Sequence, residues 1–225
     1  MATTKTDRRP ATGPKGRPKR NGLLWAGIAA GIVAVLVAVI LFTTNRPPST
    51  TEGQAQPTAA GYAVGNPGPG AEAPGFSLPS TSGSTVNLSD YRGQSVLLYF
   101  HEGLGCQPCW DQIRDLEAAR AQLKVAGIDQ LLTITSGPVN LIAQKMDDDN
   151  LSAIALADTK LDISRNYDAN KYGMMGDSRN GHSFILVGPD GTIQWRADYG
   201  GAPDYTMYVP VHKLLSDLLN AETAK

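Results

Sequence analysis

Cysteine is nearly absent from this chain: its 225 residues contain only Cys106 and Cys109, with no second Cys-x-x-Cys pair. The sequence therefore lacks the four ligands that a structural zinc site normally takes. An inert disulfide is disfavoured as well, because closing so short a loop removes little entropy from the unfolded chain. No internal repeat is present. The favoured interpretation is a redox couple whose two sulfurs join and separate.

The charge of the chain is unevenly distributed. The net charge is -1, but residues 1–20 contain seven lysines and arginines against one acid, Asp7. A basic arm can bind nucleic acid, but here an uninterrupted apolar run follows within two residues. That arrangement favours a membrane-topology signal, so no nucleic-acid partner is expected.

The apolar run extends from Leu23 to Phe42 and contains no charged or strongly polar side chain. A helix of this length covers about 30 Å, enough to cross the hydrocarbon core of a membrane. The alternative is a cleaved secretory signal, whose apolar region is usually about 7 to 15 residues long and ends at a small-residue site. Because the following residues 43–48 lack an Ala-x-Ala site, we predict an uncleaved transmembrane helix over residues 23–42.

The basic flank predicts the orientation of this helix. Positively charged segments stay on the cytoplasmic side, so residues 1–22 are expected to form a cytoplasmic arm. The rest of the chain is then extracytoplasmic, and the expected location is the cell membrane, crossed once. In that compartment a cysteine pair tends towards the disulfide unless a partner reduces it.

Two segments follow the predicted span. Residues 43–70 are rich in Pro, Thr, Ser, Gly, Ala and Gln, which predicts a flexible linker. In residues 71–225 short apolar runs alternate with helical periodicity, which is typical of an α/β sheet protein. The expected strands are 76–78, 86–88, 96–100, 131–135, 154–157, 183–187 and 192–197, and the expected helices are 110–127, 139–146 and one from about 210. The last helix is expected to bury Val211, Leu214, Leu215, Leu218 and Leu219.

Five short segments carry a resemblance to a known family: Ala73–Leu78, Val86–Gly93, Leu97–Phe100, the Cys-x-x-Cys pair and Ser183–Gly191. In this order they resemble a redoxin domain of the alkyl hydroperoxide reductase and thiol-specific antioxidant group, close to membrane-tethered thiol-disulfide oxidoreductases. The resemblance implies a thioredoxin-like three-layer αβα sandwich with a mixed central sheet. It also implies that Cys106 is an exposed nucleophile and that Cys109, more buried, resolves the mixed disulfide.

Three further residues are candidates for the site. Glu102 lies four residues before Cys106 at a strand end, where it is a candidate proton acceptor for Cys109; a solvated loop carboxylate is the alternative. His101 and His182 are expected near the cysteines, because loops after two central strands meet at one edge of this fold. Together with the two thiolates they form an alternative metal set, although the preferred interpretation has no metal and no cofactor.

Three functions are compatible with these features. We expect a membrane-anchored extracytoplasmic thiol-disulfide oxidoreductase that acts on cysteines of exported proteins and exchanges electrons with an upstream membrane donor or acceptor. A copper-delivery chaperone that uses the two cysteines and His182 is one alternative. Such chaperones have three residues between their cysteines, whereas Cys106 and Cys109 are separated by two.

A thiol peroxidase is the other alternative. Peroxidases of this family typically carry Pro-x-x-x-Thr-x-x-Cys, but here the Thr position before Cys109 is Cys106, and the Thr position before Cys106 is Gly103. Arg179 is a candidate peroxide-binding arginine, on the condition that the loop before Ser183 folds back onto the cysteines.

Overall fold

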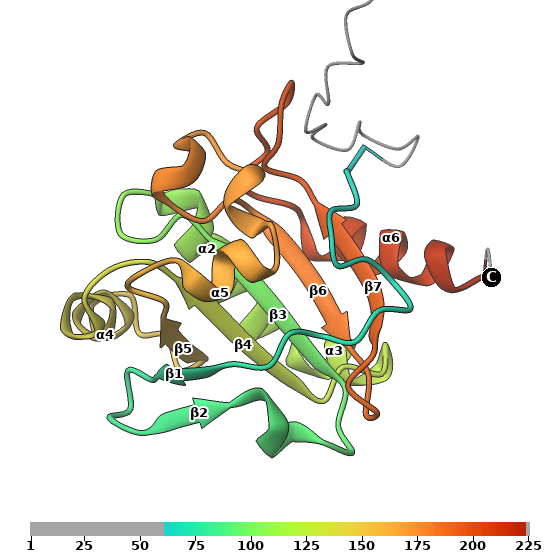
Figure 1. Ribbon diagram of the computed structural model, residues 1–225, viewed down its shortest axis with the longest axis horizontal. Helices are drawn as coiled ribbons and strands as arrows, with labels where there is room; N and C mark the ends of the chain where they lie inside the picture. The colour runs from blue at the N-terminus through green and yellow to red at the C-terminus, as the bar shows by residue number, and fades with distance from the viewer. Residues whose placement is uncertain (1–60, 224–225) are drawn as a thin grey trace, which may run out of the picture. The chain divides into compact units, whose positions relative to one another are not determined.

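The computed structural model describes residues 61–223 of the chain (Figure 1). The predicted cytoplasmic arm 1–22, the predicted transmembrane helix 23–42 and most of the predicted linker lie outside the described residues. Within residues 61–223, no helix is long and apolar enough to cross a membrane.

A five-stranded mixed sheet forms the centre of the fold, with strand order β5-β4-β3-β6-β7. The central strand β3 pairs in parallel with β4 and antiparallel with β6. All six residues of β3 are buried, as expected for a strand covered on both faces. The strand bounds are β3 Val96–His101, β4 Gln130–Thr135, β5 Ile154–Ala157, β6 Ser183–Val187 and β7 Ile193–Asp198. The predicted α/β fold with a mixed central sheet is therefore confirmed.

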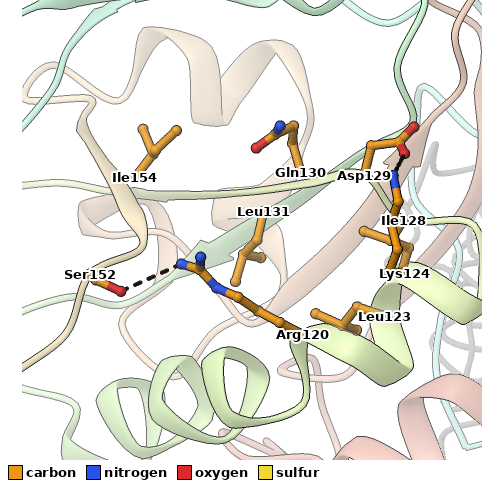
Figure 2. A pocket seen from close by; sticks show the side chains of 9 residues that line it. All are labelled: Arg120, Leu123, Lys124, Ile128, Asp129, Gln130, Leu131, Ser152 and Ile154. Atoms are coloured by element: carbon orange, nitrogen blue, oxygen red, sulfur yellow. Dashed lines mark hydrogen bonds and ion pairs between the residues drawn. The ribbon is translucent and has the colours of Figure 1, made fainter.

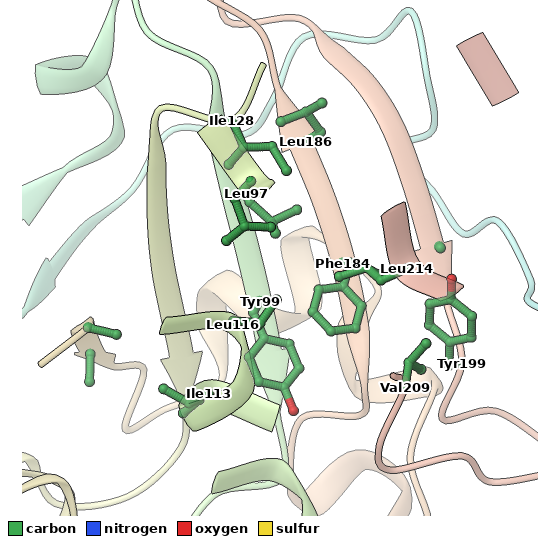
Figure 3. Close-up of a cluster of buried hydrophobic side chains, with 14 of the residues drawn as sticks. Leu97, Tyr99, Ile113, Leu116, Ile128, Phe184, Leu186, Tyr199, Val209 and Leu214 are labelled. Carbon is green, nitrogen blue, oxygen red and sulfur yellow. The ribbon is translucent and has the colours of Figure 1, made fainter. Parts of the chain in front are cut away.

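Alternating side chains of β3 point to opposite faces of the sheet, as the pleat of a strand requires. Leu97 and Tyr99 belong to a core cluster with helices α2, α3, α4 and α6 (Figure 3). Leu98 and Phe100 belong to a second cluster on the other face, beneath helix α5 and the β1–β2 hairpin. The helices are α2 Gln107–Ala118, α3 Arg120–Val125, α4 Val139–Asp148, α5 Asp162–Asn166 and α6 Val211–Thr223, and the hairpin strands are β1 Ser77–Pro79 and β2 Thr85–Asn87. Short 3-10 turns occur at Leu88–Tyr91, Ala169–Lys171 and Gly176–Ser178.

The expected single helix over residues 110–127 is two helices. The chain leaves helical geometry at Ala119, where φ is -92° and ψ is 14°, so α2 ends and α3 begins there. Leu116 and Leu123 are buried on the same face of the sheet on either side of this break, which preserves the periodicity that suggested one helix. Gly127, with φ +79°, ends α3 as predicted, because glycine tolerates this left-handed conformation.

Residues 61–70, which the composition assigns to the linker, instead pack against β7. Tyr62 is 8% exposed and lies in the core cluster beside Trp195. Ala63 bridges to Asp198, and the amide of Gly70 donates to the carbonyl of Ile193 at 2.8 Å. The linker therefore ends earlier than expected, because an aromatic side chain, edge-strand hydrogen bonds and contacts with the side chains of Arg196 and Asp198 hold a segment with few large apolar residues.

Helix α6 buries a narrower face than its sequence suggests. Leu214 and Leu218 are each 1% exposed, as predicted, whereas Leu219 is 49% exposed. Val211 and Leu215 are half-buried at the border of the core. Leu214 and Leu218 therefore form the buried face of α6, since side chains four positions apart lie on one face of a helix.

Candidate redox site

The two cysteines lie at the junction between β3 and α2 and form a disulfide with each other. Cys106 is the residue that caps α2, and Cys109 lies in its first turn. The amide of Cys109 donates to the carbonyl of Cys106 at 3.1 Å, which closes this turn. Pro108 fits between them because the first turn of a helix has no intrahelical partner for the N–H that proline lacks.

A tight loop brings the chain from β3 to the disulfide. Gly103 has φ +83°, and a Cβ at this position would clash with the hydroxyl of Thr135 on the neighbouring strand. Only glycine combines this conformation with so close an approach. The loop is fixed from the helix side by Trp110, which is fully buried and donates through Nε1 to the carbonyl of Gly103 at 3.0 Å. Trp110 thus packs under the start of α2.

The two sulfurs differ in exposure in the predicted direction. Cys109 is fully buried, and Cys106, at 6% exposed, is buried slightly less completely, so the prediction of an exposed Cys106 is wrong. Cys106 is less exposed than expected because Met207 forms a small apolar cluster with both cysteines. No sequence motif marks Met207, which lies far along the chain in the segment between β7 and α6.

Helix α2 itself holds the segment that carries Met207. The buried side chain of Gln112 accepts the amide of Val209 at 2.7 Å, and the hydroxyl of Tyr208 donates to Asp115. Helix α2, which carries Cys109, and the distant segment of residues 207–209 therefore lie together at the disulfide.

A group of aromatic rings lies beneath the disulfide, and it includes both predicted histidines. Tyr99 stacks on His101 with a centroid distance of 5.1 Å, and its hydroxyl lies 3.0 Å from Nδ1 of His182. The same hydroxyl donates to the carbonyl oxygen of Cys109 at 3.4 Å. The structure thus brings His101 and His182 together under the cysteine turn, as the strand-end argument predicts.

Both histidines are fully buried and neutral. Burial lowers the pKa of His101 to about 3. Burial, and secondarily the charge of His101, lowers the pKa of His182 to about 3. Within the described residues, neither nitrogen of His101 has a hydrogen-bond partner, and Nε2 of His182 has none. In residues 61–223 no group of three or more His, Cys, Asp or Glu side chains is placed to hold a metal ion.

Glu102 is not a solvated loop carboxylate. Its side chain is buried, with the residue 5% exposed, and Oε1 accepts the amide of Met174 at 2.7 Å. The structure therefore connects Glu102 to the loop that precedes β6. Its predicted role as proton acceptor for Cys109 stays a prediction.

Arg179 is a candidate peroxide-binding residue only if the loop before Ser183 folds back onto the cysteines. The structure shows that this loop does fold back onto the cysteine turn. A methyl group built onto Gly105 would lie 3.0 Å from Nη1 of Arg179, so the guanidinium lies against the residue that precedes Cys106. Arg179 is half-buried, and no carboxylate in the described part of the chain forms an ion pair with it. A guanidinium is always charged, so a positive charge stands beside the redox turn.

A well-defined pocket among the described residues lies away from the cysteines. A pocket of about 390 Å³ is lined by Arg120, Lys124, Asp129, Gln130, Ser152 and neighbouring apolar side chains (Figure 2). It opens where β4 begins, next to Val96 at the start of β3. Cys106 follows the opposite end of β3, about 20 Å away at 3.3 Å per residue. This pocket is therefore separate from the redox site.

A Cys-x-x-Cys disulfide at the start of the helix that follows the central strand of a mixed sheet defines a thioredoxin-like redox protein. The family model of AhpC/TSA matches residues 69–196, and the chain belongs to this family. The chain is 32% identical over 125 residues to peroxiredoxin Bcp of Escherichia coli K12, which covers 54% of this chain and 80% of that protein.

Solved structures show the same fold. Peroxidoxin BcpB from Mycobacterium tuberculosis superposes with a TM-score of 0.56 at 16% identity, over 68% of this chain and 97% of that chain. A Chlorobium tepidum protein named as the thiol:disulfide interchange protein DsbE superposes with a TM-score of 0.52 at 22% identity, over 68% and 96%. The chain is thus a redox enzyme of the thioredoxin-like peroxiredoxin group.

Proposed function

We propose that the chain is a thiol peroxidase in which Cys106 reacts with the hydroperoxide and Cys109 resolves the product. The single observation that carries the proposal is the position of Arg179 against Gly105. The family match and the relationship to peroxiredoxin Bcp support it, so this alternative is favoured over the expected oxidoreductase of exported proteins. A fixed positive charge beside the turn favours the Cys106 thiolate and binds the peroxide as negative charge develops on it.

The reaction balances with the groups present. The Cys106 thiolate attacks one peroxide oxygen, the O–O bond breaks, and the leaving oxygen takes a proton to give an alcohol or water. Cys106 is then a sulfenic acid. The Cys109 thiolate attacks its sulfur, the S–O bond breaks as the disulfide forms, and the leaving hydroxide takes a proton from solvent to give water. The two electrons come from the two cysteines, and two external thiols return them by exchange with the disulfide.

The positions of the two cysteines suit these roles. Cys106 caps the helix and is the less deeply buried of the two cysteines, and the partial positive charge of a helix N-terminus stabilises a thiolate there. Cys109 is fully buried and is already bonded to Cys106, so the resolving step requires no large movement.

Sulfenic acid trapping tests this proposal. In a Cys109→Ser variant, one equivalent of hydrogen peroxide should leave a dimedone adduct on Cys106, because the resolving sulfur is missing. The Cys106→Ser variant should neither form an adduct nor consume peroxide. Peroxide loss that is the same in the Cys106→Ser variant and the wild type would contradict the assignment.

Thiol-disulfide exchange with proteins is the second candidate. A specific observation favours it: the position of the family's peroxide-binding threonine is taken by Cys106 before Cys109 and by Gly103 before Cys106. Reduction of insulin disulfides, followed by turbidity, measures this activity. If the reduced chain cleaves insulin much faster than it consumes peroxide, the second candidate replaces the first.

The cellular setting is proposed on the sequence alone. We infer that residues 23–42 anchor the enzyme and that residues 71–225 face the extracytoplasmic space, with exported proteins or an upstream membrane thiol donor as partners. A C-terminal fusion to alkaline phosphatase, which is active only outside the cytoplasm, should be active. An inactive phosphatase with an intact full-length fusion would contradict the orientation.

A further inference from the structure

We propose that Glu102 is a positioning residue whose buried carboxylate fixes the loop of residues 173–179, so that Arg179 is held beside Cys106. The inference rests on the proposed function, because it concerns the arginine that serves the peroxidase reaction. It assigns Glu102 a role different from the proton acceptor that the sequence suggested.

The two ends of this loop are tied together at the backbone. The amide of His182 donates to the carbonyl of Tyr172 at 2.8 Å, and the amide of Gly181 donates to the carbonyl of Ala169 at 2.8 Å. A Cβ on Gly181 would clash with the carbonyl of Tyr172. The backbone segments at the two ends of the loop therefore approach each other more closely than a side chain at position 181 would allow. The base of the loop is therefore fixed by the main chain.

The body of the loop is not held by apolar packing. Met174 is 56% exposed and Met175 is 51% exposed, so neither side chain anchors the segment. Glu102, which directly follows β3, makes a polar contact with the loop: the amide of Met174 donates to Glu102 Oε1 at 2.7 Å. A methyl group built onto Gly173 would lie 2.9 Å from the same oxygen, so the carboxylate fills the space beside the loop.

Glu102 is well placed to transmit this restraint. It directly follows His101, the last residue of the rigid central strand, and it is 5% exposed. A hydrogen bond from a backbone amide to a carboxylate is stronger than one between neutral groups. Five residues beyond Met174, Arg179 lies against Gly105. The carboxylate thus connects β3 to the loop whose far end supplies the positive charge.

The charge of Glu102 and its restraint of Arg179 have opposite effects on the pKa of Cys106, so an experiment can tell them apart. Removing a nearby negative charge lowers the pKa of a thiol, whereas removing a nearby positive charge raises it. If Glu102 acted only through its charge, Glu102→Leu would lower the pKa of Cys106. If Glu102 acts through Arg179, the same variant raises it.

The experiment measures the pH profile of iodoacetamide alkylation of Cys106 in the full-length chain with Cys109→Ser. We expect Arg179→Ala and Glu102→Leu each to slow alkylation at pH 6 by about threefold to tenfold, because one pKa unit changes the thiolate fraction about tenfold. Glu102→Gln keeps an oxygen that accepts the Met174 amide, and it should retain at least the wild-type rate. The Glu102→Leu, Arg179→Ala pair should be no slower than Arg179→Ala alone.

Three results would overturn the proposal: faster alkylation in Glu102→Leu, equal slowing in Glu102→Gln and Glu102→Leu, or additive effects in the pair. Gly173→Ala provides a second route if Glu102→Leu does not fold, because its methyl group displaces the loop while the carboxylate stays. It should slow alkylation and speed hydrogen exchange at the Met174 amide, and unchanged values of both would contradict the proposal. None of these measurements uses peroxide, so they remain decisive if the wild type proves not to be a peroxidase.

Discussion

His101 is enclosed by aromatic rings, and its two nitrogens have no hydrogen-bond partner in the described part of the chain. A buried polar atom without a partner costs free energy, so this side chain is tolerated rather than required for stability. His182 shares the same surroundings, but its Nδ1 forms a hydrogen bond with the hydroxyl of Tyr99. The two imidazoles therefore make the fold sensitive to acid.

Stability should fall as the pH falls from about 6.5 towards 3. In this window the unfolded chain protonates both histidines, whose ordinary pKa is 6.5, while the folded chain, in which the pKa of each is about 3, does not. Each histidine then removes about 1.4 kcal/mol of unfolding free energy per pH unit. The His101→Phe variant keeps a ring stacked on Tyr99. In this variant we expect the histidine contribution to the change of unfolding free energy with pH to halve. Urea unfolding at pH 6 and pH 4 measures this change.

The exposed His212 provides the matched control for this experiment. His212→Asn should leave the pH slope as it is in the wild type. A His101→Phe variant that also keeps the wild-type slope would show that the folded chain protonates His101 readily, contrary to its burial.

Most of the individual residues of the redox site can be predicted from the sequence, but not all of them. The spacing of Cys106 and Cys109 identified the pair, and the ends of two strands indicated that His101 and His182 converge. Met207 was beyond prediction, because a single methionine in a loop carries no periodicity or spacing. The contact of Glu102 with Met174 was equally hidden, since it joins a side chain to a backbone amide.

Helix α2 organises the site at the scale of elements. It carries Cys109 in its first turn, and one turn further on Gln112 accepts the amide of Val209, which holds Met207 over the disulfide. We therefore expect this contact between α2 and the segment that leads into α6 to limit access to the disulfide.

Gln112→Leu should therefore make the disulfide easier to reach. Loss of the acceptor for a buried amide costs about 1 to 3 kcal/mol, and it loosens the segment that carries Met207. We expect faster reduction by dithiothreitol and a lower urea midpoint. Gln122→Leu, on the exposed side of α3, is the matched control and should change neither. If reduction in Gln112→Leu proceeds at the wild-type rate, Met207 does not shield the sulfurs.

The strands and helices follow from sequence patterns with two exceptions that have physical causes. The break at Ala119 was missed because no glycine or proline marks it and the apolar periodicity continues through it. Helix α5 was missed because its five residues, Asp162–Asn166, are too few to show a period of 3.6. The strong strands, such as β3 and β6, were found because buried strands are continuous apolar runs.

At the scale of the whole molecule, a buried ion pair attaches residues 61–70 to the sheet. Arg196 and Asp198 are both buried on β7 and are joined by two hydrogen bonds of 2.8 and 3.0 Å. Asp198 also accepts the amide of Gly65 at 2.7 Å, and Arg196 donates to the carbonyl of Pro67 at 3.0 Å. Composition alone could not reveal this, because the partners of the segment lie more than a hundred residues further along the chain.

Arg196→Met in the full-length chain should lower the free energy of unfolding by about 3 to 5 kcal/mol, because it leaves the Asp198 carboxylate buried without its cation. Urea unfolding measures the change. The exposed pair of Arg92 and Glu72, 3.7 Å apart, supplies the control. Arg92→Met should cost no more than about 1 kcal/mol, as is usual for surface pairs. Equal losses in the two variants would show that residues 61–70 are not held by the buried pair.

The stoichiometry of a single turnover is the sharpest test of peroxidase activity at Cys106. Fully reduced chain, freed of reductant, is mixed with excess hydrogen peroxide, and peroxide loss and the Cys106–Cys109 disulfide are quantified together. If Cys106 and Cys109 act as a peroxidase pair, one peroxide disappears for each disulfide formed, and neither change occurs in Cys106→Ser. Peroxide that persists beside reduced cysteines, or that disappears without disulfide formation, would contradict this role of the pair.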